Sequence, residues 1–268
     1  MKSLPQYTEA NRLAWNEVMP KHQAGNQDKW DQRFSTPGYS VFESPEREEL
    51  EALGIVGKEI AHLCCNNGVE LMSLQNMGAA RTVGFDISDE AIQEATQRAK
   101  TCGIDSTFIR TDVYEIDGEY DNTFELVYIS IGCLGWMPDL KRFFTCASRL
   151  LKSGGTLFIY EQHPFTEMLS CDSDSHPDPL QLVGPYFKSE PYEENDGIDY
   201  IGKETYESKT MYWFVWTLSD ILTALLGADF VLQSFQEYEK DISAGHQKNE
   251  QADLAIPLSY ILIANKSE

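Results

Sequence analysis

The 268-residue sequence predicts an α/β fold with one doubly wound, mostly parallel sheet. Three observations predict this fold. Residues 60–71 form a strand, a tight turn and a helix, residues 140–159 change from a helical to a strand pattern, and two strands close the chain. The hydrophobic content of 42% is enough for one large domain of this class.

The first strand of the predicted sheet begins at Ile60 and leads into a turn that ends at Gly68. Asn66 and Gly68 can both adopt the left-handed backbone region that a tight turn requires. A second strand ends at Asp86, 18 residues after Gly68, which is close to the spacing at which an acid accepts ribose hydroxyls. This half of the fold is therefore predicted to bind a nucleoside.

The turn also indicates which kind of nucleoside fits. A pyrophosphate site prefers the pattern G-x-G-x-x-G, but Cys64 and Asn66 stand where its first two glycines would be. Glu70, just inside the following helix, would repel an anion. The sequence favours a nucleoside without phosphate over a dinucleotide.

The later elements continue the alternation of helix and strand. Ser88 is placed to cap a helix over residues 89–102, which Gly103 ends. Apolar residues at helical spacing predict a helix over residues 140–151, stopped by Gly154 and Gly155 before the next strand. Residues 230–238 and 258–264 are predicted as two strands joined by a polar loop.

Several segments, taken in order, resemble the motifs of the class I S-adenosylmethionine-dependent methyltransferases. They are His62–Gly68, Gly84–Ser88, Phe108–Val113, the strand Leu126–Ile131, and Leu150–Ile159 with its leucine-lysine-x-glycine-glycine pattern. The resemblance covers most of residues 55–266. It implies a Rossmann-like, doubly wound sheet of seven strands with an antiparallel C-terminal hairpin, an N-terminal helical lid, and an insertion after the fifth strand.

The resemblance also implies the cofactor, S-adenosyl-L-methionine, which leaves as S-adenosyl-L-homocysteine. Asp86 would hold the ribose hydroxyls, Asp112 the adenine amino group, and the turn the methionine part. The chain departs from the family at His62, where an acid is usual. The implied cofactor-binding residues are His62, Cys64, Asn66, Gly68, Asp86, Ile87, Asp112, Val113 and Ser130.

Two regions outside the shared core are expected to determine the substrate, because loops and insertions on a rigid scaffold usually carry specificity. We expect residues 1–45 to form a lid segment on a methyltransferase domain of residues 46–268. Residues 162–215 would form a cap within that domain. The aromatic residues of these regions either line a pocket or simply pack; the candidate substrate-binding residues are Trp15, Tyr39, Trp136, Tyr186 and Trp213.

Methyl transfer from a sulfonium is an in-line displacement, in which the protein mainly supplies alignment and excludes water. A base would help an acceptor that must lose a proton. The candidates are His163, which is preferred, and Glu161, both just beyond the fifth strand, with His22 from the lid. The alternative for a lone histidine is a local hydrogen bond.

Charge and hydropathy disfavour several partners. The formal net charge of −22 leaves no obvious basic stripe for a nucleic acid. No apolar stretch is long enough to span a membrane, so a cytoplasmic protein is expected. No metal is expected either, because a solvated loop explains the alternating residues Asp172, Asp174, His176 and Asp178.

The sequence therefore predicts an enzyme that transfers a methyl group from S-adenosylmethionine to a small-molecule acceptor. One alternative is a protein that binds S-adenosylmethionine without catalysis. A second, less favoured alternative is an NAD-dependent oxidoreductase on the same kind of sheet.

Overall fold

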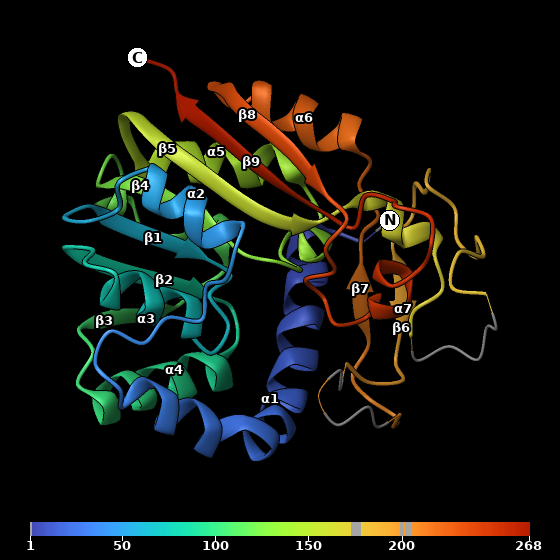
Figure 1. Cartoon of the computed structure of the whole chain (residues 1–268), viewed down its shortest axis with the longest axis horizontal. Helices are drawn as coiled ribbons and strands as arrows, with labels where there is room; N and C mark the ends of the chain where they lie inside the picture. The colour runs from blue at the N-terminus through green and yellow to red at the C-terminus, as the bar shows by residue number, and fades with distance from the viewer. Residues whose placement is uncertain (1, 173–177, 199–200, 202–204) are drawn as a thin grey trace.

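The computed structural model describes residues 2–172, 178–198, 201 and 205–268, and it confirms the α/β fold. A seven-stranded sheet with the order β3-β2-β1-β4-β5-β9-β8 crosses the molecule (Figure 1). Its strands are β1 (Glu59–Leu63), β2 (Arg81–Asp86), β3 (Ser106–Arg110), β4 (Phe124–Ile129), β5 (Leu151–Gln162), β8 (Phe230–Tyr238) and β9 (Ser259–Lys266). The acidic segment that contains Asp174 and His176 lies outside the described residues.

The strand directions position the site. β1 pairs in parallel with both β2 and β4, whereas β9 pairs antiparallel with both β5 and β8. The expected antiparallel C-terminal hairpin is thus confirmed. The order of the parallel strands reverses between β1 and β4, which is where doubly wound sheets bind their ligands.

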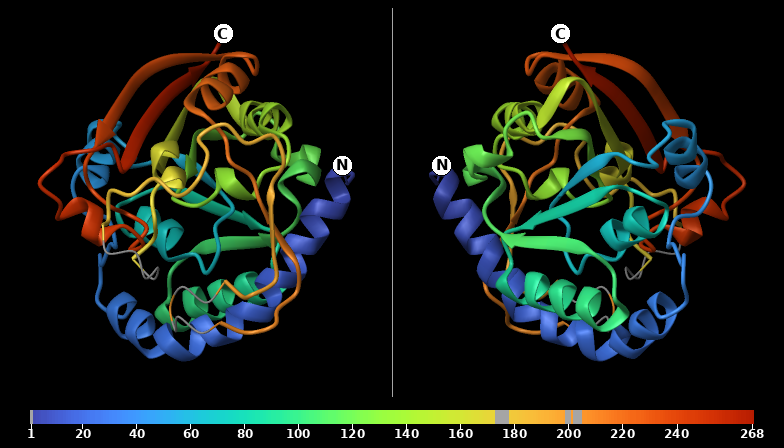
Figure 2. Two further views of the ribbon diagram at one scale, coloured as in Figure 1. Left: turned by 90° about the vertical axis from the view of Figure 1, so that its right-hand side faces the viewer. Right: turned by 90° about the vertical axis from the view of Figure 1, so that its left-hand side faces the viewer.

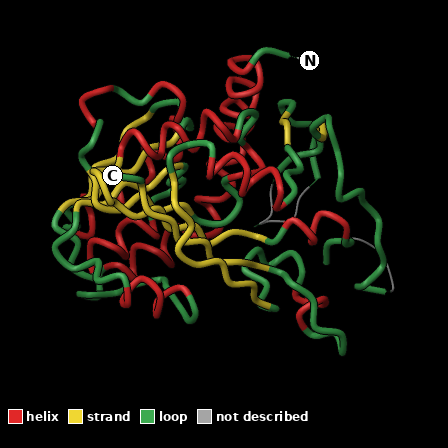
Figure 3. Tube along the Cα trace, turned by 90° about the horizontal axis from the view of Figure 1, so that it is seen from above, coloured by secondary structure: helices red, strands yellow, loops and turns green. Residues whose placement is uncertain are grey.

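Helices cover both faces of the sheet, as the view from above shows (Figure 3). On one face, side chains of α5 and α6 pack on alternate strand residues such as Leu63 and Ile129; on the other, α2 and α3 pack on Ile60 and Tyr128. The helices are α1 (Leu4–Phe34), α2 (Glu46–Ala52), α3 (Val69–Asn76), α4 (Asp89–Cys102), α5 (Leu140–Leu150), α6 (Leu218–Leu226) and α7 (Gln247–Glu250). None of the helices among the described residues is long and apolar enough to span a membrane.

The N-terminal segment is one helix of 31 residues that runs beside α4 and reaches a small second sheet (Figure 2). That sheet consists of β6 (Tyr192–Glu194) and β7 (Met211–Trp213). The side chain of Asn11 joins α1 to it, because it donates to the Tyr212 carbonyl at 3.0 Å and accepts from the Tyr212 amide at 2.7 Å. A segment close to the N-terminus therefore packs on a strand late in the chain.

One predicted boundary is wrong. The helix expected to stop at Gly154 ends at Leu150, and β5 begins at the next residue. The pairing with β4 shifts between Leu151 and Thr156, so the residues between them bulge from the ladder, with Gly154 at a φ of 70°. The two glycines serve this bulge and do not end the helix.

Candidate functional site

The turn after β1 has the left-handed backbone that the sequence suggested. The φ angles of Cys64, Asn66 and Gly68 are 57°, 46° and 77°. A side chain at Gly68 would have no room, since a Cβ atom there would lie 2.4 Å from the ring of Phe108. The backbone of β1 can therefore turn sharply and present its amides at the carboxyl edge of the sheet.

Asp86, at the end of β2, fixes this turn. Its Oδ2 accepts from the Asn66 amide at 2.8 Å and its Oδ1 accepts from the Ser88 amide at 2.8 Å. Burial raises the pKa of Asp86, although these backbone amides oppose the shift. A carboxylate offers about four acceptor positions, so both oxygens can still accept hydroxyl hydrogens.

Asp112 lies just beyond the end of the neighbouring strand β3. Its Oδ1 accepts from the Tyr114 amide at 3.0 Å and caps a short 3-10 helix. Asp86 and Asp112 line one cavity of about 540 Å³, hereafter the main cavity, which is large enough for a cofactor. Two acids on adjacent strand ends can thus accept hydrogen bonds from one ligand.

The main cavity brings together most, but not all, of the residues predicted from the sequence. Those that line it are Cys64, Asn66, Asp86, Ile87, Asp112, Val113 and Ser130 from the cofactor set, and Trp15, Trp136 and Trp213 from the substrate set. Those that do not line it are His62, Gly68, Tyr39, Tyr186, Glu161 and His163. Tyr39 instead packs edge-on against Phe34, and the hydroxyl of Tyr186 accepts from the Leu218 amide at 3.2 Å.

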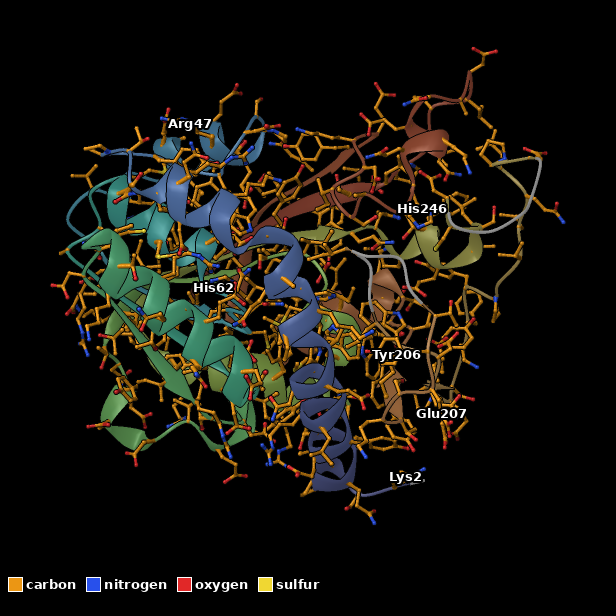
Figure 4. All side chains as sticks on the ribbon, turned by 90° about the horizontal axis from the view of Figure 1, so that it is seen from below. Lys2, Arg47, His62, Tyr206, Glu207 and His246 are labelled. Atoms are coloured by element: carbon orange, nitrogen blue, oxygen red, sulfur yellow. The ribbon has the colours of Figure 1, made fainter. Side chains whose placement is uncertain are left out.

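His62 lies behind the lining, inside the molecule (Figure 4). Its Nε2 is 3.1 Å from the hydroxyl oxygen of Ser130, which does line the main cavity. Burial lowers the pKa of His62 to about 3, so the ring is neutral at neutral pH. His62 can therefore orient Ser130 but cannot supply a charge to the site.

Glu161 anchors a loop of the cavity wall. Its two carboxylate oxygens accept from the backbone amides of Gly132 at 2.6 Å, Cys133 at 2.9 Å, Leu134 at 3.1 Å and Gln162 at 2.8 Å. Burial raises its pKa to about 7, while these amides lower it. Gly132 and Cys133 line the main cavity, so Glu161 shapes the wall from behind.

His163 is held by groups outside the main cavity. Its Nδ1 accepts from the Phe165 amide at 3.0 Å, and its Nε2 lies 3.0 Å from a carboxylate oxygen of Glu237. Burial lowers its pKa, although Glu237 opposes this shift. This geometry fits the alternative expected for a lone histidine, which is a side chain that makes only local contacts.

Three tryptophans meet in the wall of the main cavity. The ring of Trp136 is 5.4 Å from that of Trp15 on α1 and 5.0 Å from that of Trp213 on β7, both edge-on. The indole N–H of Trp213 donates to Glu167 at 2.9 Å. The three rings come from the N-terminal helix, the loop after β4 and the insertion, and together they form one aromatic wall.

Several lining residues were missed by sequence reasoning. They include Thr8, Asn11, Tyr114, Met137, Gln162, Ile198, Ile201, Ile242 and Ser243. Tyr114, Met137 and Gln162 stand next to predicted residues, whereas Ile242 and Ser243 come from a distant segment that no local pattern marks. Within the described residues, no group of three or more acidic, histidine or cysteine side chains could hold a metal ion.

Comparison with known proteins identifies the core of this site. A family model described as a methyltransferase domain matches residues 60–155, which span the strands from β1 into β5. Ribosomal protein L11 methyltransferase of Serratia proteamaculans is 29% identical over 108 residues, which cover 40% of this chain and 35% of that protein. The chain spans about half or less of the length of the curated relatives it matches.

Solved structures agree with the fold. An S-adenosylmethionine-dependent methyltransferase from Mesorhizobium loti superposes with a TM-score of 0.60 at 21% identity, covering 82% of this chain and 97% of that one. A geranyl diphosphate C-methyltransferase from Streptomyces coelicolor, solved with Mg²⁺, geranyl diphosphate and S-adenosyl-L-homocysteine, has a TM-score of 0.56 at 14% identity, covering 83% and 79%. The domain match and the shared fold confirm the resemblance inferred from the sequence motifs.

Proposed function

We propose that this chain, which carries the methyltransferase domain and the fold of the class I S-adenosylmethionine-dependent methyltransferases, transfers a methyl group from S-adenosylmethionine to a small-molecule acceptor. One observation supports it most: Asp86 and Asp112, from adjacent strand ends, line the same 540 Å³ cavity as the turn after β1. That arrangement suits a nucleoside whose ribose and base are held by separate carboxylates.

The residues of the main cavity would divide the cofactor among them. We assign the ribose hydroxyls to Asp86, the adenine amino group to Asp112 and a ring nitrogen to the backbone amide of Val113. Ile87 would pack on the adenine face. The backbone around Cys64 and Asn66, held in place by Gly68, would surround the methionine part.

When bound, S-adenosylmethionine supplies an electrophilic methyl group on a positively charged sulfur. The chain must then align the acceptor and exclude water. We propose that α1, within residues 1–45, acts as the lid, and that part of the insertion 162–215 forms the facing wall. Trp15, Trp136 and Trp213 exclude water where these segments meet, and their ring faces attract positive charge.

Proton transfer by Glu161 or His163 stays a prediction. Neither side chain lines the main cavity, and the Glu161 carboxylate already accepts four backbone amides. We propose that Glu161 positions the loop after β4 and that His163 fixes the chain after β5.

The direct test is calorimetric binding of S-adenosylmethionine and S-adenosylhomocysteine to the parent and to Asp86→Ala, with NAD as a control. We expect micromolar binding, about −8 kcal/mol, that is lost in the variant. An exposed acid, Asp105, provides the matched control Asp105→Ala, which should bind as the parent does. Binding of NAD alone would overturn the proposal in favour of an oxidoreductase, whereas cofactor binding without turnover on any acceptor would favour a non-catalytic protein.

A further inference from the structure

Ser130 lies where the methionine part of the cofactor is expected. It directly follows Ile129, the last residue of β4, which pairs with Leu63 at the end of β1. This pairing brings Ser130 to the same part of the sheet edge as Cys64, the first residue of the turn after β1. Both residues line the main cavity, so the Ser130 side chain is within the region assigned to the methionine part.

The two charged ends of that methionine part, an ammonium and a carboxylate, meet unequal surroundings. Three acids, Glu70, Asp86 and Asp112, line the main cavity, so acceptors for an ammonium group are plentiful. No lysine, arginine or histidine lines it in the part of the chain that the structure describes. A carboxylate can also be stabilised by two or three uncharged hydrogen-bond donors. The cofactor carboxylate therefore depends on N–H and O–H groups without a charge.

The backbone amides of the turn and of the loop after β4 supply few of these donors. In the turn, the amides of Cys65, Asn66 and Gly68 already donate within the protein, at 3.0, 2.8 and 2.9 Å. In the loop, the amides of residues 132–134 all donate to Glu161. A hydroxyl at the end of β4 is therefore valuable to a carboxylate, provided that its hydrogen points into the main cavity.

His62 sets the direction of the Ser130 hydroxyl. Its Nε2 lies 3.1 Å from the Ser130 oxygen, whereas its Nδ1 is buried without a hydrogen-bond partner among the described residues. Because the ring is neutral at neutral pH, only one of the two nitrogens carries a hydrogen. Buried N–H groups without a partner are rarer than acceptors without one. The hydrogen therefore belongs on Nε2, which donates to the Ser130 oxygen.

This arrangement leaves Ser130 as a donor toward the main cavity. Its hydroxyl makes no other hydrogen bond with the described residues. At position 62 the related methyltransferases usually have an acid, which when ionised can only accept. An acid would take the Ser130 hydrogen and turn the oxygen lone pairs to the cavity. Histidine reverses that polarity and also removes a negative charge that would repel a carboxylate.

We propose that Ser130, oriented by His62, donates its hydroxyl hydrogen to the carboxylate of the methionine part of S-adenosylmethionine. His62 is then a positioning residue that acts through Ser130. This inference rests on the proposed methyltransferase function and assigns one of its cofactor contacts to a departure of this chain from its family.

Ser130→Ala tests the contact, since it removes only the hydroxyl oxygen. Calorimetry measures the binding of two probes, S-adenosylhomocysteine and its decarboxylated counterpart, in which hydrogen replaces the carboxylate. We expect the variant to bind S-adenosylhomocysteine about 10- to 100-fold more weakly than the parent, and the decarboxylated probe within about threefold of the parent. Ser153→Ala, at an exposed serine, is the matched control and should bind both probes as the parent does.

The orientation of Ser130 has its own test in the ligand-free protein. Nitrogen NMR should show the His62 ring hydrogen on Nε2, with the His62 signals assigned by their loss in His62→Gln. The glutamine amide can still donate to Ser130, so His62→Gln should keep S-adenosylhomocysteine binding within about threefold of the parent. His62→Leu cannot donate and should weaken that binding by more than His62→Gln does.

A ring hydrogen on Nδ1 would overturn the proposal. Equal weakening of both probes by Ser130→Ala would also contradict it, because the hydroxyl would then contact another part of the cofactor. Unchanged binding of both probes would mean that Ser130 does not contact the cofactor. A parent that binds neither probe would instead contradict the proposed function itself.

Discussion

The main cavity and a smaller second cavity, lined in part by Glu46, Tyr160 and Lys240, share lining residues, yet they are built in different ways. The nucleoside end of the main cavity is made by consecutive strand–turn–helix units, with Asp86 and Asp112 at the ends of neighbouring strands. The second cavity is closed by Glu46 before the sheet begins and by residues 240–242 near the end of the chain. The nucleoside end thus depends on the local geometry of the sheet edge, while the second cavity depends on segments that are far apart in the sequence.

The largest effect should come from the turn at the nucleoside end. Gly68→Ala places a Cβ atom 2.4 Å from the Phe108 ring at a φ of 77°. We expect the free energy of unfolding to fall by about 3 kcal/mol or more, and cofactor binding to be lost, as measured by urea denaturation and calorimetry.

The control for this prediction is Gly154→Ala, with a φ of 70° but no atom within 4 Å of the added Cβ. It should lose only the backbone cost of about 1–2 kcal/mol. Equal losses in the two variants would mean that the packing of the turn against Phe108 is unimportant.

A smaller effect is expected at Glu161, which supports a wall of the main cavity. In Glu161→Gln, one oxygen that accepts two backbone amides becomes an NH₂ group that faces them. We expect a loss of about 3 kcal/mol in the free energy of unfolding, together with weaker cofactor binding. Glu115→Gln, at an exposed position, is the control; a variant as stable as the parent would show that the loop does not need this anchor.

The pH dependence of stability tests the packing behind the main cavity, where His62 is fully buried. Its pKa falls from 6.5 to about 3 on folding, so the unfolded chain binds the proton more readily. Stability should therefore decrease as pH falls below about 6.5, with a contribution from His62 of about 2 kcal/mol at pH 5.

Chemical denaturation between pH 5 and 7.5 measures this contribution. His62→Gln should remove that part of the slope while the remaining pH dependence persists. An identical slope in the variant would assign the acid sensitivity to other groups.

The smallest and most local effect is expected where α1 meets β7. Asn11→Ala removes both hydrogen bonds to Tyr212. We expect about 1–2 kcal/mol less protection of the Tyr212 amide in hydrogen exchange, with little change in the strands of the large sheet. Glu9→Ala, on the exposed side of α1, should leave that amide unaffected; equal protection in Asn11→Ala would contradict a pinning role.

The same contrast explains what the sequence could predict. The turn at Gly68 and the acid at Asp86 follow from local spacing and backbone preference, which operate within a few residues. His163 shows the limit, because its position beside Pro164 pointed to the sheet edge but not to Glu237, which lies on β8. Glu46 gave no signal, since only the packing of α2 against Tyr128 brings it beside Glu70.

The helix α1 has a consequence for how two ligands would influence each other. The side chain of Asn16 on α1 forms hydrogen bonds with the side chains of Ser88 and Asp89, which closely follow Asp86 in the chain. Asn11 of the same helix holds β7. One helix thus contacts segments next to Ile87 and next to Trp213, two lining residues of the main cavity. A ligand at either end that favours one position of α1 must alter the affinity at the other end, and thermodynamic linkage makes that change reciprocal.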